Sequence, residues 1–140
     1  MADDDVLAGR VRDELEIRNV LARIAHYSDM GELDDYGAQF TADARWKMPG
    51  VPAKHGRAKI QEAGAGRRAE GVTGPGSHTR HVIGTVAVTV GGDSAVAESY
   101  WQFYGNTTTT PVLRSMGHYR DLFRRTPQGW RLARREITSG

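Results

Sequence analysis

Residues 77–90, with the sequence SHTRHVIGTVAVTV, alternate in the way that predicts a long β-strand with two different faces. One face carries valine at positions 82, 86, 88 and 90, so we expect this face to pack against other parts of the protein. The opposite face begins with Thr79 and His81 and mixes small, polar and apolar side chains. A mixed face of this kind is typical of a pocket wall, which makes His81 the first candidate for a functional residue.

Apolar residues recur at helical spacing from the N-terminus to about residue 28 and predict one long amphipathic helix. The apolar positions are Leu7, Val11, Leu15, Ile17, Val20, Leu21 and Ile24. The spacing changes near Glu14, where the helix could be interrupted, and Gly31 marks its end. Asp29 falls in the last turn, where a carboxylate opposes the helix dipole. It is therefore either a solvated acid at a helix end or the partner of another group.

Shorter patterns complete the order of elements. They predict helices over residues 33–40 and 57–70, on either side of a short strand at 44–48. Residues 71–77 form a glycine-rich loop that could act as a flap over a site. Alternation then predicts strands at 78–90, 94–104, 112–125 and 130–137, joined by turn signals at 91–92 and 126–129. Helices followed by an antiparallel meander indicate a single α+β domain over residues 1–140.

Composition narrows the functional classes. A chain of 140 residues is long enough to form one hydrophobic core. The absence of cysteine excludes a disulfide framework, a thiol nucleophile and a thiolate metal site. The formal charge of +2 is too small to indicate a nucleic-acid partner, and no apolar run is long enough to span a membrane. The acidic start is unlike a signal peptide, so we expect a soluble, cytoplasmic protein.

Several stretches of the chain, together with the order of elements, resemble the SnoaL-like branch of the nuclear-transport-factor-2-like superfamily. They are IRNVLARIAHYSD, FTADARWKMPG, TRHVIGTVAV, MGHYRDLFRRT and GWRLARREI, which together cover roughly Ile17 to Ile137. The resemblance implies a cone-shaped α+β barrel, in which a curved, mostly antiparallel sheet wraps around the long N-terminal helix. It also implies an apolar pocket, open at one end, and a homodimer or higher homo-oligomer formed through the outer face of the sheet.

Within this superfamily, scytalone dehydratase and the hexachlorocyclohexane dehydrochlorinase are similar to this chain at two catalytic positions. The resemblance places their aspartate at Asp29 and their histidine at His81. An aspartate that orients a histidine suits proton abstraction, as in β-elimination of water or halide, or in an enolisation that shifts a double bond or closes a ring. Ser28 stands where these relatives carry a tyrosine, so the resemblance does not extend to the substrate.

A proton donor or oxyanion partner would have to lie opposite such a base. The candidates for lining the pocket and binding substrate are Tyr27, Trp46, Tyr100, Tyr104, His118 and Tyr119. Tyr100 and Tyr104 come first because they share a strand face with polar residues, although each tyrosine is also explained as a core side chain. His118 is either a second titrating group or a histidine satisfied by hydrogen bonds. His78 and His81 are three apart and would converge only if His78 lies in the loop before the strand, since on a strand they point to opposite faces; we therefore expect no metal site.

The leading hypothesis is a lyase or isomerase of the dehydratase or cyclase type that uses no cofactor. Its substrate would be a small hydrophobic molecule, oxygenated or aromatic, and His81 and Asp29 would form its general base. The alternative is a non-catalytic small-molecule-binding protein or a dioxygenase-β-like structural subunit, in which the same two residues only brace the helix against the sheet. An epoxide hydrolase would need an Asp–Arg–Asp arrangement in the pocket. Arg114 and Asp121 do not supply it, because they lie on different faces of their strand.

Overall fold

The computed structural model describes residues 2–140, in which the expected elements occur in the expected order, with one strand added. The helices are α1 (Ala2–Met30), α2 (Leu33–Ala38) and α3 (Arg57–Ala69). The strands are β1 (Phe40–Lys47), β2 (Lys54–His55), β3 (Arg80–Gly91), β4 (Ser94–Gly105), β5 (Val112–Thr126) and β6 (Gly129–Ser139). Strand β2 is the addition, and it pairs antiparallel with β1.

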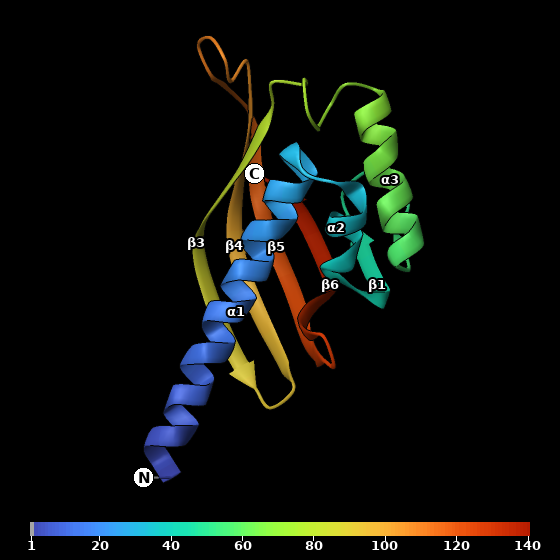
Figure 1. Cartoon of the computed structure of the whole chain (residues 1–140). Helices are drawn as coiled ribbons and strands as arrows, with labels where there is room; N and C mark the ends of the chain where they lie inside the picture. The colour runs from blue at the N-terminus through green and yellow to red at the C-terminus, as the bar shows by residue number, and fades with distance from the viewer. Residues whose placement is uncertain (1) are drawn as a thin grey trace.

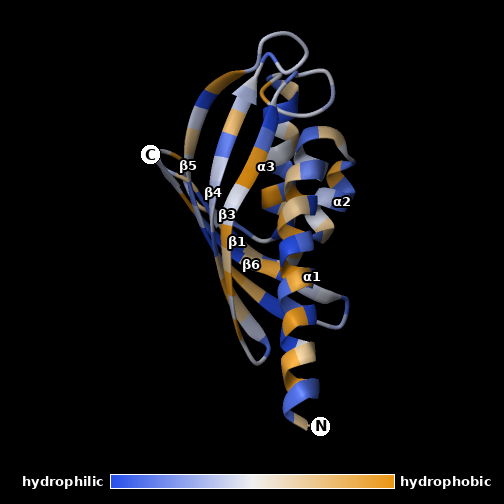
Figure 2. Ribbon diagram, turned by 90° about the vertical axis from the view of Figure 1, so that its left-hand side faces the viewer, coloured by the Kyte–Doolittle hydropathy of each residue, from blue (hydrophilic) through white to orange (hydrophobic). Residues whose placement is uncertain are grey.

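The strands form one sheet in the order β2-β1-β6-β5-β4-β3. Neighbouring strands run antiparallel, except that β1 lies parallel to β6. All three helices lie on one face of this sheet, which curves around α1 (Figures 1 and 2). The α+β class and the cone-like curvature are confirmed, but the sheet is not a closed barrel because β2 and β3 remain as its two edges.

Helix α1 is continuous through Glu14, and only its second half is buried. The buried residues are Ile17, Val20, Leu21, Ile24, Ala25 and Asp29. Leu7, Val11 and Leu15 are exposed, although they follow the same helical spacing. Figure 1 shows the first turns of the helix projecting beyond the strands. The amphipathic pattern therefore predicts the helix correctly but extends past the part of it that the sheet covers.

Strand β3 contains a bulge that changes which residues face inward. Its pairing with β4 shifts between Gly84 and Ala87, and Thr85 has a positive φ of 51°. An extra residue in a strand reverses the alternation beyond it. Ile83 therefore shares the inner face with the valines at 86, 88 and 90, which pack against the core, whereas Val82 is 45% exposed. The prediction that all four valines share one packed face is wrong for this reason.

The core lies between the inner face of the sheet and the second half of α1. Its fully buried members include Phe40, Phe123 and Trp130 from the strands and Ile17 and Val20 from the helix. The Trp130 indole also donates a hydrogen bond to Asp13 Oδ1 at 3.0 Å, which ties β6 to α1. These contacts fix the helix across the sheet and leave a space beside its C-terminal end. Within residues 2–140, no helix combines the length and the apolar character that a membrane span needs.

Candidate functional site

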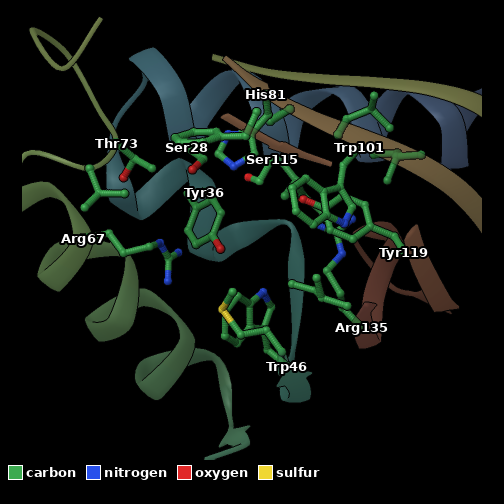
Figure 3. A pocket seen from close by; sticks show the side chains of 18 residues that line it. Ser28, Tyr36, Trp46, Arg67, Thr73, His81, Trp101, Ser115, Tyr119 and Arg135 are labelled. Atoms are coloured by element: carbon green, nitrogen blue, oxygen red, sulfur yellow. The ribbon is translucent and has the colours of Figure 1, made fainter. Parts of the chain in front are cut away.

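A cavity of about 220 Å³ lies between the curved sheet and the C-terminal half of α1 (Figure 3). Its apolar lining consists of Leu21, Ile24, Ala25, Trp46, Met48, Val72, Ile83, Trp101, Phe103 and Ile137, together with the aromatic rings of Tyr36 and Tyr119. Its polar lining consists of Ser28, Arg67, Thr73, His81, Ser115 and Arg135. An apolar wall with a few converging polar groups is the usual character of a small-molecule site.

Asp29 and His81 meet at the wall of this cavity. His81 Nδ1 lies 2.7 Å from Asp29 Oδ1, and the His81 backbone N–H donates to Asp29 Oδ2 at 2.9 Å. The carboxylate accepts two hydrogen bonds and is only 3% exposed. Asp29 is therefore not a solvated acid at a helix end, because the start of β3 supplies both of its partners.

Arg68 explains how a carboxylate is tolerated at the C-terminal end of α1. Its Nη2 donates to the carbonyl oxygens of Tyr27 and Gly31, each at 2.7 Å, and so satisfies carbonyls that the last turn leaves free. A cation at this end also offsets the negative pole of the helix. The 71–77 loop packs onto Arg68, since a Cβ at Gly74 would lie 2.8 Å from Arg68 Cγ. The Arg68 side chain, which comes from α3, thus fixes the last turn of α1, the turn that carries Asp29.

The bond to Asp29 determines which nitrogen of His81 is available. With Nδ1–H donating to the carboxylate, Nε2 carries the lone pair of the neutral ring. Within residues 2–140, no group hydrogen-bonds to Nε2. The side chain is 20% exposed, lines the cavity and packs against Phe103, with ring centroids 4.7 Å apart. The ring is therefore oriented, and its basic nitrogen is free to accept a proton.

A second charged pair borders the cavity on β5 and β6. Arg135 Nε and Nη2 donate to the two oxygens of Asp121 at 2.8 and 2.9 Å, and both side chains are buried. Burial raises the pKa of Asp121, and the guanidinium opposes that rise. Burial alone would lower the pKa of Arg135, but the Asp121 charge and hydrogen bonds outweigh it and raise that pKa. The pair is a bidentate ion pair that leaves Arg135 positively charged.

An aromatic stack lies against the Arg135 side of this ion pair. The Arg135 guanidinium lies 3.8 Å from the centroid of the Tyr119 ring, which stacks on Trp101 at 6.1 Å. Burial raises the pKa of Tyr119 to about 12, so its phenol stays protonated at neutral pH and can only donate or accept as a neutral group. The cavity therefore has a cationic and phenolic region distinct from the Asp29–His81 pair.

Arg67 on α3 adds a further cation to the lining. Its guanidinium lies 5.3 Å from the centroid of the Trp46 ring, and Figure 3 shows its side chain directed into the cavity. A cation over the face of an indole is weakly attracted, but the indole cannot neutralise it. Arg67 therefore differs from Arg135, whose charge a carboxylate already balances.

The structure brings together only some of the residues predicted to bind substrate. Trp46 and Tyr119 line the cavity. Tyr100, Tyr104 and His118 do not, because β4 and β5 alternate and present Trp101, Phe103 and Tyr119 inward. The other face carries Tyr100, which is 52% exposed and packs against the His118 ring, and the Tyr104 hydroxyl, which bonds to Gln102.

Two further residues also lie outside the cavity lining. Tyr27 does not line the cavity, because the neighbouring positions Ala25 and Ser28 occupy the face of α1 that does. None of these four residues, Tyr27, Tyr100, Tyr104 and His118, lines the cavity. His118 instead lies on the outer face of the sheet, where its Nε2 is 3.6 Å from Glu98 Oε1. Arg114 does not line the cavity, and its side chain lies beside Gly105.

The alternation along β5 and β6 indicates that Arg135 is buried beside Asp121. Asp121 lies between Tyr119 and Phe123 on the apolar face of its strand, and Arg135 alternates with Ile137 on the next strand. Opposite charges on the apolar faces of adjacent strands predict a buried ion pair wherever the register places them side by side, as it does here. Arg67 had no comparable signal, because the apolar content of α3 does not define which of its residues faces the cavity.

The histidines do not assemble into a metal site. Residues 2–140 contain no group of three or more His, Cys, Asp or Glu side chains placed to hold an ion. His78 lies in the loop before β3, with a φ of 55°. Its carbonyl oxygen accepts a hydrogen bond from the Thr107 N–H at 3.1 Å.

The curved sheet and its covering helices define an NTF2-like fold, which encloses an apolar cavity. Residues 9–136 match the SnoaL-like domain family, and the chain belongs to this family. A comparison with curated proteins finds no match.

Solved structures give the same result. An NTF2-like protein with a cystatin-like fold from Novosphingobium aromaticivorans is similar to this chain with 30% sequence identity and a TM-score of 0.83, over 95% of this chain and 87% of that one. A second protein from that organism, proposed to be an aromatic ring hydroxylase, has 28% identity and a TM-score of 0.78, over 92% and 90%. A proposed dehydratase of the NTF2-like family from Streptomyces avermitilis shares the fold, with 17% identity and a TM-score of 0.76, over 92% and 97%.

Proposed function

We propose that this protein is a lyase or isomerase that removes a proton from a small hydrophobic substrate, oxygenated or aromatic, without a cofactor. The observation that carries the proposal is the hydrogen bond between buried Asp29 and His81, whose other ring nitrogen is free at the wall of an apolar cavity. A cavity of roughly 150 Å³ holds a benzene ring, so about 220 Å³ is enough for one substituted ring. The proposed activity of the 28% identical neighbour, a ring hydroxylase, also supports an aromatic ligand.

The proposed reaction begins with proton transfer from a substrate carbon to His81 Nε2. Asp29 holds the ring in the required tautomer and stabilises the imidazolium that forms. The electron pair of the broken C–H bond moves into an adjacent carbonyl to form an enolate, or expels a leaving group from the neighbouring carbon. The positive charge of Arg135 and the neutral Tyr119 phenol, both in the cavity lining, favour the negative oxygen that develops.

The second candidate function is ligand binding without catalysis. It is favoured by one specific contact, the hydrogen bond from the His81 backbone N–H to Asp29 Oδ2 at 2.9 Å. This contact joins the end of α1 to the start of β3 whether or not the ring takes part in chemistry. A dioxygenase-β-like structural subunit would need the pair only for this purpose.

Hydrogen exchange in D₂O distinguishes the two functions. Small cyclic and aryl ketones are incubated with wild type, His81→Gln and Asp29→Asn, and the loss of the proton next to the carbonyl is followed by NMR. We expect exchange by the wild type and a loss of about 10²- to 10⁴-fold in His81→Gln, which is the usual contribution of a positioned general base. Retained binding, read from the fluorescence of Trp46 and Trp101, shows that the pocket is intact. Binding with no exchange by the wild type would support the non-catalytic function.

A further inference from the structure

Arg67 is the one arginine in the cavity lining that has no acidic partner among residues 2–140. His81 is paired with Asp29, and Arg135 is paired with both oxygens of Asp121. Arg67 is half-buried, and its guanidinium lies over the face of the Trp46 ring, 5.3 Å from the ring centroid. A guanidinium left next to apolar walls is a site that a negatively charged ligand group would complete.

The backbone around Arg67 is held firmly although its side chain is unpaired. The Arg67 carbonyl oxygen accepts a hydrogen bond from the Val72 N–H at 2.9 Å, which closes the end of α3. The adjacent Arg68 is bonded to the last turn of α1, the turn that carries Asp29. The position of Arg67 relative to the Asp29–His81 pair is thus fixed by these two helix ends. Such fixed spacing is what a site needs to orient a ligand between an anchor and a base.

The charges of the site favour a ligand with one kind of group bound at Arg67. Asp29 and Asp121 each have their oxygens engaged, so neither is available to neutralise Arg67. The planar guanidinium presents a fork of N–H donors that matches the two oxygens of a carboxylate. A ligand carboxylate would also be opposite in charge to the imidazolium that forms when His81 accepts a proton.

We infer that the ligand of this cavity carries a carboxylate, which Arg67 binds, on the same small hydrophobic molecule that reaches His81. Arg67 then determines specificity for acids over their neutral analogues. The inference rests on the proposed function only in taking this cavity as the substrate site, because carboxylate binding does not require proton transfer.

The test compares carboxylates with their neutral isosteres by calorimetric titration. The probes are benzoate, phenylacetate, cinnamate and 2-naphthoate, each paired with the corresponding amide. In the wild type we expect at least one acid to bind about tenfold or more tightly than its amide, since hydrogen bonds to charged groups typically contribute 10- to 100-fold. Arg67→Gln should reduce the ratio to within about twofold while amide binding stays the same, and Arg67→Lys should restore part of it.

Lys59→Gln is the matched control, because it removes one positive charge from the same helix at a side chain that is 67% exposed and outside the cavity. It should leave the ratio unchanged. An acid-to-amide ratio that survives in Arg67→Gln, or a wild type that prefers no acid in the panel, would overturn the inference. Failure of the proposed function is distinguishable from this, because it appears as absent hydrogen exchange in a wild type that still selects carboxylates.

Discussion

Replacing Asp121 with asparagine tests whether the buried ion pair supports the cavity. Asp121 and Arg135 are 1% and 4% exposed, and they share two hydrogen bonds at 2.8 and 2.9 Å. Asparagine keeps the shape but removes the negative charge, so the guanidinium stays buried without compensation. Breaking a buried pair in this way typically costs about 3–5 kcal/mol. We expect the lower end, about 3 kcal/mol, because Arg135 borders the cavity, where water can reach it.

The expected loss converts into a melting temperature through the unfolding entropy. About 2.1 cal/mol/K per residue over 140 residues gives roughly 0.29 kcal/mol/K, so about 3 kcal/mol lowers Tm by roughly 10 °C. Differential scanning calorimetry of wild type and Asp121→Asn at pH 7 measures this shift. Urea unfolding at 25 °C gives the free energy independently.

The matched control lies on the neighbouring strand β4. Glu98 is bound to Arg120 at 3.2 Å on the outer face of the sheet, where both side chains are at least half exposed. Exposed pairs contribute about 0–1 kcal/mol, so Glu98→Gln should lower Tm by less than roughly 3 °C. The double variant Asp121→Leu/Arg135→Met should recover most of the loss, because it leaves no buried charge. If Asp121→Asn melts no lower than Glu98→Gln, the argument from burial is refuted.

Two further predictions concern residues around the same ion pair. Burial raises the pKa of Tyr119 from 10.0 to about 12, so its contribution to the stability of the fold is complete below pH 10 and is lost as the pH rises toward 12. Between pH 9 and 11, the free energy of unfolding in urea should fall by about 1.4 kcal/mol more for wild type than for Tyr119→Phe, and equal losses would contradict this. Gly117→Ala should lower the free energy of unfolding by about 2 kcal/mol or more and shift the fluorescence of Trp101, because a Cβ would overlap the Thr138 carbonyl oxygen and lie 2.6 Å from Trp101 Cζ2. Gly84→Ala is the control, since a Cβ there meets open space, and similar effects of the two variants would refute the packing argument.

The order of elements was predictable because it depends on local periodicity. Helical spacing identified α1 and α3, and alternation with turn signals identified β3 to β6 to within a few residues. The inward face of β3 was not predictable in the same way. The bulge at Thr85 reverses the alternation, and the residues around it are not of types that indicate a bulge. Tyr100 and Tyr104 were misassigned by a related limitation, since alternation separates two faces without saying which one a curved sheet turns inward.

Within the site, Asp29 and His81 were predictable only from the resemblance to a family. They are separated by 52 residues, and spacing along the chain does not indicate that two such residues meet. The local rules in fact disfavoured a functional Asp29, because they predict an unfavourable acid at a helix C-terminus. The structure resolves this with Arg68, which supplies the missing cation from α3.

The polar side chains at the cavity differ in how completely the protein satisfies them, and this difference decides their roles. Asp121 and Arg135 satisfy each other and are buried, so a ligand gains little by displacing either, and the pair holds the Arg135 charge and the Tyr119 ring in fixed positions. His81 is satisfied at Nδ1 alone, and Arg67 has no acidic partner among residues 2–140. A molecule gains the most where the protein has left polar groups unpaired within an apolar wall. The arrangement therefore favours an acid that places its carboxylate at Arg67 and a weakly acidic C–H bond at His81.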